Sequence, residues 1–205
     1  MKNKRSIANM TTSIINSVLV LAFTPILIVF AALKSNILGV VFISISYPLL
    51  FIHFILKSIY YPQTSHVPRN ILSLISDIML NIFICLITIY NILNIDSNIK
   101  WFLLGVICFL TIISIVIEFA NNLLIHKIIV SITVMIALYT ILIIYPFNIV
   151  TYMGVISIVL YYIITITSDT KNNYLNTIEI IPLLLFSLFL LFIWYNQNRR
   201  VSSWK

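Results

Sequence analysis

The residue in this sequence with the clearest capacity for chemistry is Asp77, a carboxylate inside an otherwise apolar run. Ser73, Asp77, Asn81 and Cys85 follow one another at steps of four residues, so in a helix they share one face. A carboxylate that faces lipid is energetically costly, so this face is expected to point into a helix bundle. Asp77 is then expected to be the titrating group of a path for an ion, a proton or a polar substrate, with Asn81 beside it. The alternative is structural: the run begins near Asp77, and the carboxylate snorkels or caps the helix N-terminus.

A second polar stripe lies toward the end of the next apolar run along the chain. Thr111, Ser114 and Glu118 fall within one helical sector, and Asn121 and Asn122 continue it. Because the connection between the two runs is short, this stripe is in a position to face the Asp77 stripe across a helical hairpin. The alternative is that Glu118 is an interfacial side chain with loop asparagines next to it.

The histidines and cysteines do not form a metal-binding pattern. A zinc site needs three or four ligands at recognisable spacing, and the sequence contains no His-Glu-x-x-His and no Cys-x-x-Cys. We expect His53, His66 and His126 at membrane edges, and Cys85 and Cys108 as free thiols deeper in apolar runs. We therefore expect neither a metal nor a cofactor.

Catalytic motifs are also missing from the sequence. There is no Gly-x-Ser-x-Gly elbow, no glycine-rich phosphate loop and no Walker sequence. An intramembrane enzyme would need a nucleophile clustered with a base, and the sequence does not indicate such a pair. We therefore expect a protein that is not an enzyme.

The composition indicates which elements must position these residues. Of 205 residues, 61% are hydrophobic and only 8% are charged, whereas an ordinary soluble domain is about 45–50% apolar and about 25% charged. So few charged residues cannot cover the exterior of a soluble fold. The sequence therefore predicts one integral membrane domain over residues 1–205.

Seven apolar runs are long enough, or nearly so, to cross a bilayer, which takes about 20 residues. They are continuous rather than alternating, and backbone groups in lipid must bond within their own segment, so each is expected to be a helix. The predicted fold is an all-α, polytopic transmembrane helix bundle of about seven spans, with six as an alternative. The predicted spans lie near residues 13–33, 37–56, 71–92, 101–120, 128–145, 149–166 and 178–195.

The net charge of +7 arises from 12 lysines and arginines against 5 acidic residues. Most of these cations lie in tails and loops, as expected for side chains at an anionic lipid surface, and they do not indicate nucleic-acid binding. For seven spans with the N-terminus inside, 7 cations lie inside and 5 outside; for six spans the division is 9 against 3. The sequence leaves open the side on which the C-terminus lies.

Two functions remain from this reasoning. The small, Ile-rich, multi-span, motif-free chain is similar in composition to accessory or immunity proteins encoded beside bacterial secretion and toxin systems. This similarity predicts a non-enzymatic component of the bacterial cytoplasmic membrane. We expect it to bind lipid and also another membrane protein, a toxin or a secreted peptide. That function predicts an apolar lateral groove. The alternative is a small ion- or proton-coupled carrier or transporter subunit in which Asp77, Asn81 and Glu118 face one another in the bundle core.

Overall fold

The chain folds into α-helices in every described segment of regular structure. The computed structural model describes residues 2–34, 36–62, 66–95, 97–120, 123–144, 149–168, 181–182 and 184–192. Residues 181–182 and 184–192 are also helical. The predicted all-α fold is therefore confirmed. The named helices are α1 (Lys2–Leu33), α2 (Ile37–Tyr60), α3 (His66–Leu93), α4 (Ile99–Phe119), α5 (Leu123–Ile144) and α6 (Ile149–Ser168).

The helices coincide with the apolar runs, but α1, α3 and α5 begin five or more residues earlier than the sequence predicted, and α4 begins two residues earlier. Helix α1 begins at Lys2, and α3 begins at His66, because their polar first turns continue the helix ahead of the apolar stretch. The start of α2 is fixed by Asn36, whose side-chain oxygen accepts a hydrogen bond from the Gly39 backbone N–H at 2.8 Å. Such a cap satisfies one of the N–H groups that a helix N-terminus leaves without a partner.

The predicted number of seven spans is wrong, and about four spans replace it. Within the described residues, four helices are long and apolar enough to cross a membrane. The apolar parts of α5 and α6, Ile128–Ile143 and Thr151–Ile164, are shorter. The chain is thus a multi-pass membrane protein whose four candidate spans are Ile7–Leu33, Ile37–Tyr60, Ile71–Leu93 and Ile99–Phe119.

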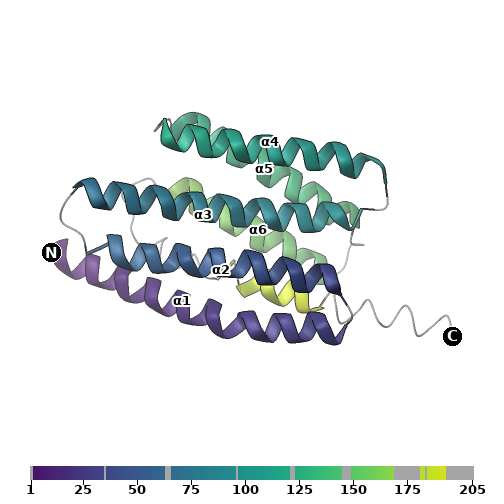
Figure 1. The fold of residues 1–205 in the computed structure, drawn as a ribbon, viewed down its shortest axis with the longest axis horizontal. Helices are drawn as coiled ribbons and strands as arrows, with labels where there is room; N and C mark the ends of the chain where they lie inside the picture. The colour runs from purple at the N-terminus through teal and green to yellow at the C-terminus, as the bar shows by residue number, and fades with distance from the viewer. Residues whose placement is uncertain are drawn as a thin grey trace.

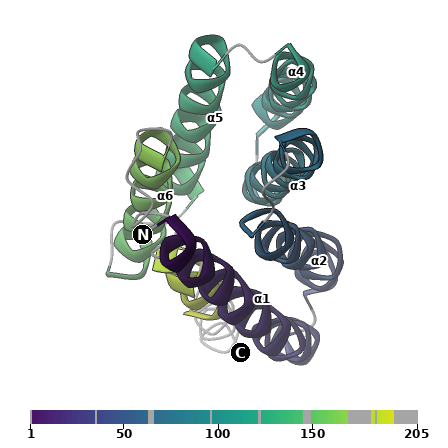
Figure 2. The same cartoon turned by 90° about the vertical axis from the view of Figure 1, so that its left-hand side faces the viewer.

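The helices form two layers (Figures 1 and 2). Helices α1, α2, α3 and α4 pack one against the next in chain order and make a curved layer. Helix α5 packs against both α3 and α4, and α6 packs against α5, which creates the second layer. Helix α3 consequently contacts α2, α4 and α5, so its side chains have more neighbouring helices than those of α1 or α6.

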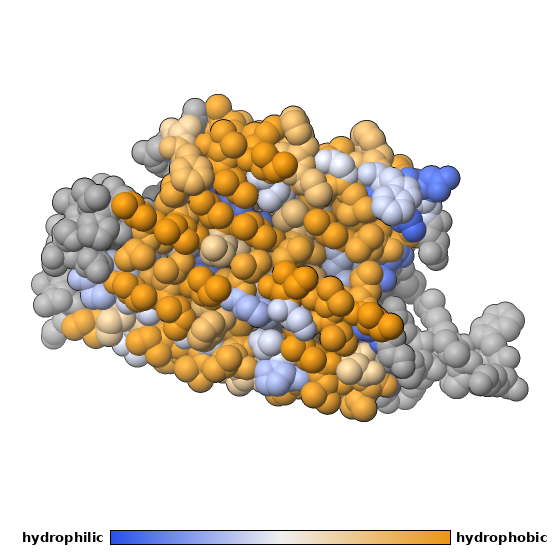
Figure 3. All heavy atoms as spheres, in the orientation of Figure 1, coloured by the Kyte–Doolittle hydropathy of each residue, from blue (hydrophilic) through white to orange (hydrophobic). Residues whose placement is uncertain are grey.

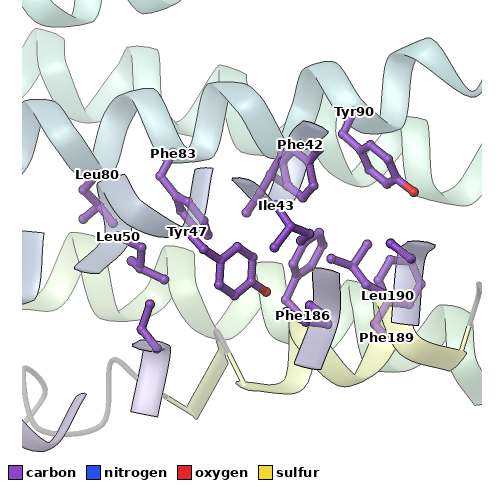
Figure 4. Close-up of a cluster of buried hydrophobic side chains, with 14 of the residues drawn as sticks. Phe42, Ile43, Tyr47, Leu50, Leu80, Phe83, Tyr90, Phe186, Phe189 and Leu190 are labelled. Atoms are coloured by element: carbon purple, nitrogen blue, oxygen red, sulfur yellow. The ribbon is translucent and has the colours of Figure 1, made fainter. Parts of the chain in front are cut away.

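The largest hydrophobic cluster joins helix 184–192 to the first layer (Figure 4). Five aromatic residues of this cluster form a group that we call the aromatic core: Phe42, Tyr47, Phe83, Phe186 and Phe189. The Tyr47 and Phe83 rings meet edge to face with centroids 5.9 Å apart, and the Phe186 and Phe189 centroids lie 5.6 Å apart. The core is therefore built from α2, α3 and a helix more than 90 residues later in the chain.

Two specific contacts fix helix 184–192 in this position. The hydroxyl oxygens of Tyr47 and Ser187 lie 2.6 Å apart in a buried hydrogen bond. On α6, a Cβ added to Gly154 would lie 2.8 Å from the Phe189 ring, so only glycine leaves room for that ring. The Phe189 side chain is fully buried as a result.

The outside of the bundle is strongly apolar, as the face in Figure 3 shows. Large hydrophobic side chains remain exposed along the outer faces of α1 and α4, including Val18 at 58%, Phe102 at 70% and Phe109 at 63%. Contiguous exposed apolar surface of this kind is rare on soluble monomers and suits contact with lipid. The predicted association with a bilayer is supported by this surface and by the four long helices.

The positively charged residues of the described helices gather at one end of the bundle. Helices α1, α3 and α5 begin at this end and α2 finishes there (Figure 1). The other end, where α1 finishes and α4 begins, carries Lys34 and Lys100. Among the described residues, the first end therefore carries more Lys and Arg than the second. The cations of the first end are Lys2, Lys4, Arg5, Lys57, Arg69 and Lys127.

Candidate functional site

Asp77 lies well inside α3. The helix begins at His66, eleven residues earlier, so the alternative in which Asp77 caps the helix N-terminus is wrong. Its side chain is half-buried, and the Ser73 hydroxyl donates a hydrogen bond to Asp77 Oδ2 at 3.4 Å. This bond joins two members of the predicted polar face, one helical turn apart.

One turn further along α3, Asn81 lines a small pocket between three helices. Thr111 and Ser114 of α4 and Thr133 of α5 line the same pocket, whose volume is about 10 Å³. We call these four residues the polar junction. The structure therefore brings the α3 stripe together with the α4 stripe at Asn81, Thr111 and Ser114. Thr133 was not singled out by the sequence, because α5 is apolar almost throughout and shows no polar periodicity.

In the polar junction, both threonine hydroxyls donate their hydrogen bonds to their own helices. The Thr111 hydroxyl donates to the Ile107 carbonyl oxygen at 2.8 Å, and the Thr133 hydroxyl donates to the Ile129 carbonyl oxygen at 3.0 Å. Both threonine oxygens keep lone pairs that can accept a hydrogen bond. The Asn81 side-chain nitrogen is buried and has no hydrogen-bond partner. The junction thus contains an unused donor close to two available acceptors.

Glu118 continues the α4 stripe one turn beyond Ser114. Because α3 and α4 are antiparallel and pack together, the pairing of Asn81 with Ser114 places Asp77 and Glu118 at the same level of the bundle. The Glu118 Oε2 atom is buried. The role of Asp77, Asn81 and Glu118 as an ion or substrate path stays a prediction. Asn121 and Asn122 lie outside the described residues.

The inward face of α3 continues past the polar junction. Ile84, which also lines the junction pocket, and Thr88 line a second cavity of about 40 Å³, together with Ser157 of α6 and Phe186. We call it the central cavity. Three residues beyond Thr88 lies Asn91, which is fully buried, with neither side-chain polar atom hydrogen-bonded. Positions 77, 81, 84, 88 and 91 follow steps of four and three, so they form one helix face about 21 Å long.

A buried pair that sequence analysis missed links α2 to the opposite side of α3. His53 Nδ1 lies 2.7 Å from the Ser76 carbonyl oxygen and 2.9 Å from Ser76 Oγ, and both residues are fully buried. His53 is therefore a buried side chain between α2 and α3, and its expected place at a membrane edge stays a prediction. The spacing of His53 and Ser76 in the chain gives no signal, because their contact depends on how two helices are rotated against each other. The side chains of His66 and His126 lie outside the described residues.

The geometry of this pair is that of a link between helices rather than of a nucleophile and its base. A carbonyl oxygen only accepts hydrogen bonds, so the short contact requires the proton on His53 Nδ1. With that proton in place, Nδ1 cannot accept a proton from Ser76 Oγ. The Ser76 hydroxyl instead donates to the His53 carbonyl oxygen at 3.2 Å.

Within the described side chains, no three His, Cys, Asp or Glu residues gather closely enough to hold a metal ion. Cys85 and Cys108 are free thiols, as predicted, although Cys108 is exposed on the outer face of α4 rather than buried. The chain matches no family model, and comparisons with curated proteins and with solved structures give no match.

Proposed function

We propose that this multi-pass membrane protein is a small, non-enzymatic, ion-coupled carrier or transporter subunit whose path follows the inward face of α3. The observation that carries the proposal is Asn91, a fully buried carboxamide with no hydrogen bond to the residues around it. Leaving such a group without a partner costs about 1–3 kcal/mol. A path offers an explanation, because the carboxamide then bonds to the species that passes.

The arrangement along α3 supports the same function. Asp77 stands at one end of this face, the polar junction follows, and the central cavity and Asn91 lie beyond it. Intramembrane ionisable residues that face a bundle interior are typical of ion pathways and proton relays. The face covers about 21 Å of the roughly 30 Å of hydrocarbon, which is most of the distance an ion must cross.

The test is ion flux into proteoliposomes that contain the purified protein and dyes sensitive to protons, sodium or potassium. We expect Asp77→Asn to abolish the flux and Asn91→Leu, which replaces the amide with an apolar group of similar size, to reduce it strongly. Asn98→Leu is the matched control, since Asn98 is exposed and its side chain does not cap α4. Wild-type flux in both path variants, or no flux of any of the three ions, would overturn the proposal.

A second candidate function is the accessory, immunity or partner-binding role in a bacterial cytoplasmic membrane. The observation that favours it is a hollow of about 320 Å³ on the outer face of α5, lined by Ser131, Ile132, Met135, Ile136 and Tyr139. It is almost entirely apolar, as the expected lateral groove would be. Flexible methionine side chains adapt well to a docked segment of another membrane protein, a toxin or a secreted peptide.

This second function is tested by a photo-cross-linking amino acid placed at Met135 in native membranes, with Ile112 as the control. Both residues are exposed, at 68% and 63%, but Ile112 lies on α4 away from the hollow. One discrete protein adduct at position 135 and none at position 112 would support partner binding. Adducts with lipid alone at both positions would exclude it.

A further inference from the structure

We infer that the transported ion is a proton and that a single water molecule bound in the polar junction transfers it along the path. The inference rests on the proposed function, which it deepens by naming the transported species. It is carried by the size of the pocket and by the pattern of hydrogen-bond donors and acceptors around it.

The volumes exclude an organic solute from this conformation. The polar junction encloses about 10 Å³ and the central cavity about 40 Å³. A cavity needs about 10–15 Å³ to hold one water molecule, whose share of liquid volume is about 30 Å³. The junction is therefore just large enough for one water molecule, and the central cavity also takes one.

The lining of the junction matches the hydrogen bonds of one water molecule. The Asn81 side-chain nitrogen, which has no other partner, can donate to the water oxygen. The water can donate its two protons to the oxygens of Thr111 and Thr133, whose own protons are committed to backbone carbonyls. The Thr111 oxygen can accept this bond, because its proton points to the Ile107 carbonyl oxygen and its lone pairs are acceptors. Three hydrogen bonds are what a buried water molecule typically makes.

The same lining is poorly suited to a metal cation. Hard cations bind several oxygen ligands, and their protein sites are built from carboxylates, carbonyls and hydroxyls. In the junction, the Asn81 N–H₂ group carries partial positive charge and repels a cation. The distribution of donors and acceptors thus selects water over sodium or potassium.

Titratable groups lie one helical turn from the junction, toward the end of the bundle where α3 begins. They are Asp77 on α3 and Glu118 on α4, with Cys85 of α3 on the other side of Asn81. The described face of α5 toward the junction, Val130 to Ala137, contributes no titratable group. His53 and Lys57 belong to α2, which packs on another side of α3.

In the transfer step, the O–H bond of the protonated Asp77 carboxyl group breaks, and its proton binds a lone pair of the junction water. Another O–H bond of that water then breaks, and its proton binds a lone pair of the water molecule in the central cavity, which Thr88 and Ser157 line. The Asp77 carboxylate and the junction water are then as they were before Asp77 was protonated, and the transferred proton lies on the second water molecule.

The experiment measures proton flux in proteoliposomes for Thr133→Val, which removes the hydroxyl and keeps the shape of the side chain. We expect about a tenfold loss of flux, because the water loses one of its three partners. Thr133→Ser, which restores a hydroxyl, should recover the flux. Thr11→Val is the matched control, since the exposed Thr11 hydroxyl makes the same type of bond, to the Ile7 carbonyl at 2.9 Å.

The outcomes separate this inference from the proposed function. Wild-type proton flux in Thr133→Val, or loss of flux that Thr133→Ser does not recover, would overturn the inference. Flux of sodium or potassium without protons would also overturn it, while the carrier function would stand. No flux of any ion from the wild-type protein would overturn the carrier function itself.

Discussion

Two parts of α3 contribute to regions of different chemistry. The part from Ser76 to Asn81 has buried polar residues of α2, α4 and α5 among its neighbours. The part from Phe83 to Tyr90 contributes Phe83, Ile87 and Tyr90 to the large hydrophobic cluster around helix 184–192. One helix therefore belongs both to the polar junction and to the aromatic core.

The difference indicates that separate regions of this membrane bundle contribute most to its stability and to its proposed transport chemistry. In lipid, apolar surfaces gain little by leaving the solvent, so helices associate through close packing and a few interhelical hydrogen bonds. The aromatic core supplies such packing. The polar junction leaves an Asn81 donor without a partner, which a purely structural contact would not do. We therefore expect the core to dominate the free energy of unfolding and the junction to dominate flux.

The largest expected effect on stability is that of Phe189→Ala in the aromatic core. The fully buried ring leaves a cavity, and such truncations cost about 3–5 kcal/mol in soluble proteins. Because lipid is itself apolar, we expect a cost near the lower limit, about 3 kcal/mol, measured by unfolding in detergent micelles. Phe192→Ala is the control, at a ring that is 45% exposed. Equal losses for the two variants would contradict a packed core at Phe189.

His53→Ala tests whether the polar contacts near Ser76 of α3 also hold helices together. The variant loses the hydrogen bonds to Ser76 and leaves space in the bundle, which together are expected to cost about 2 kcal/mol. The measurement is the same unfolding assay, with the exposed Ser44→Ala as the control. A loss larger than that of Phe189→Ala would break the division between the two regions.

Gly154→Ala sharpens the description of the aromatic core. The new methyl group would lie 2.8 Å from the Phe189 ring, and overpacking of this kind costs about 1–3 kcal/mol. We expect a loss of about 1.5 kcal/mol that Phe189→Leu partly reverses in the double variant. Gly105→Ala is the matched control, because a Cβ at Gly105 meets nothing within 4 Å. If the two glycine variants unfold alike, α6 does not pack against Phe189 as described.

The smallest expected effect is that of Tyr47→Phe, which removes one hydroxyl from the core. The lost bond to Ser187 is expected to cost about 1 kcal/mol. A double-mutant cycle with Ser187→Ala measures it, and we expect the two changes together to cost less than the sum of each alone. Strict additivity would show that the two hydroxyls do not interact.

Sequence reasoning located the helices because long apolar runs have few alternatives to a helix in lipid. It also placed Asn81 on the face that meets Thr111 and Ser114, since regular spacing within a helix defines which residues share a face. The number of spans was overestimated, because only the predicted spans near 13–33, 37–56, 71–92 and 101–120 coincide with described helices that are long and apolar enough to cross a membrane.

Contacts between helices were largely beyond prediction. Thr133 and the pair of His53 and Ser76 are brought together by the rotation and order of packed helices, which a single sequence does not define. Asn91 lies near the end of its run, where a polar residue reads as a boundary, and only its burial reveals it as part of the inward face.

The central claim is that the polar face of α3 is turned toward α4 inside the bundle. Its most direct test is oxidative cross-linking of Asn81→Cys with Ser114→Cys in a Cys85→Ala, Cys108→Ala background, using a membrane-permeant copper oxidant. The account predicts that this pair forms an intramolecular disulfide, whereas Asn81→Cys with Val116→Cys, at a 60% exposed position, does not. Cross-linking of the control pair in preference to the junction pair would contradict the account.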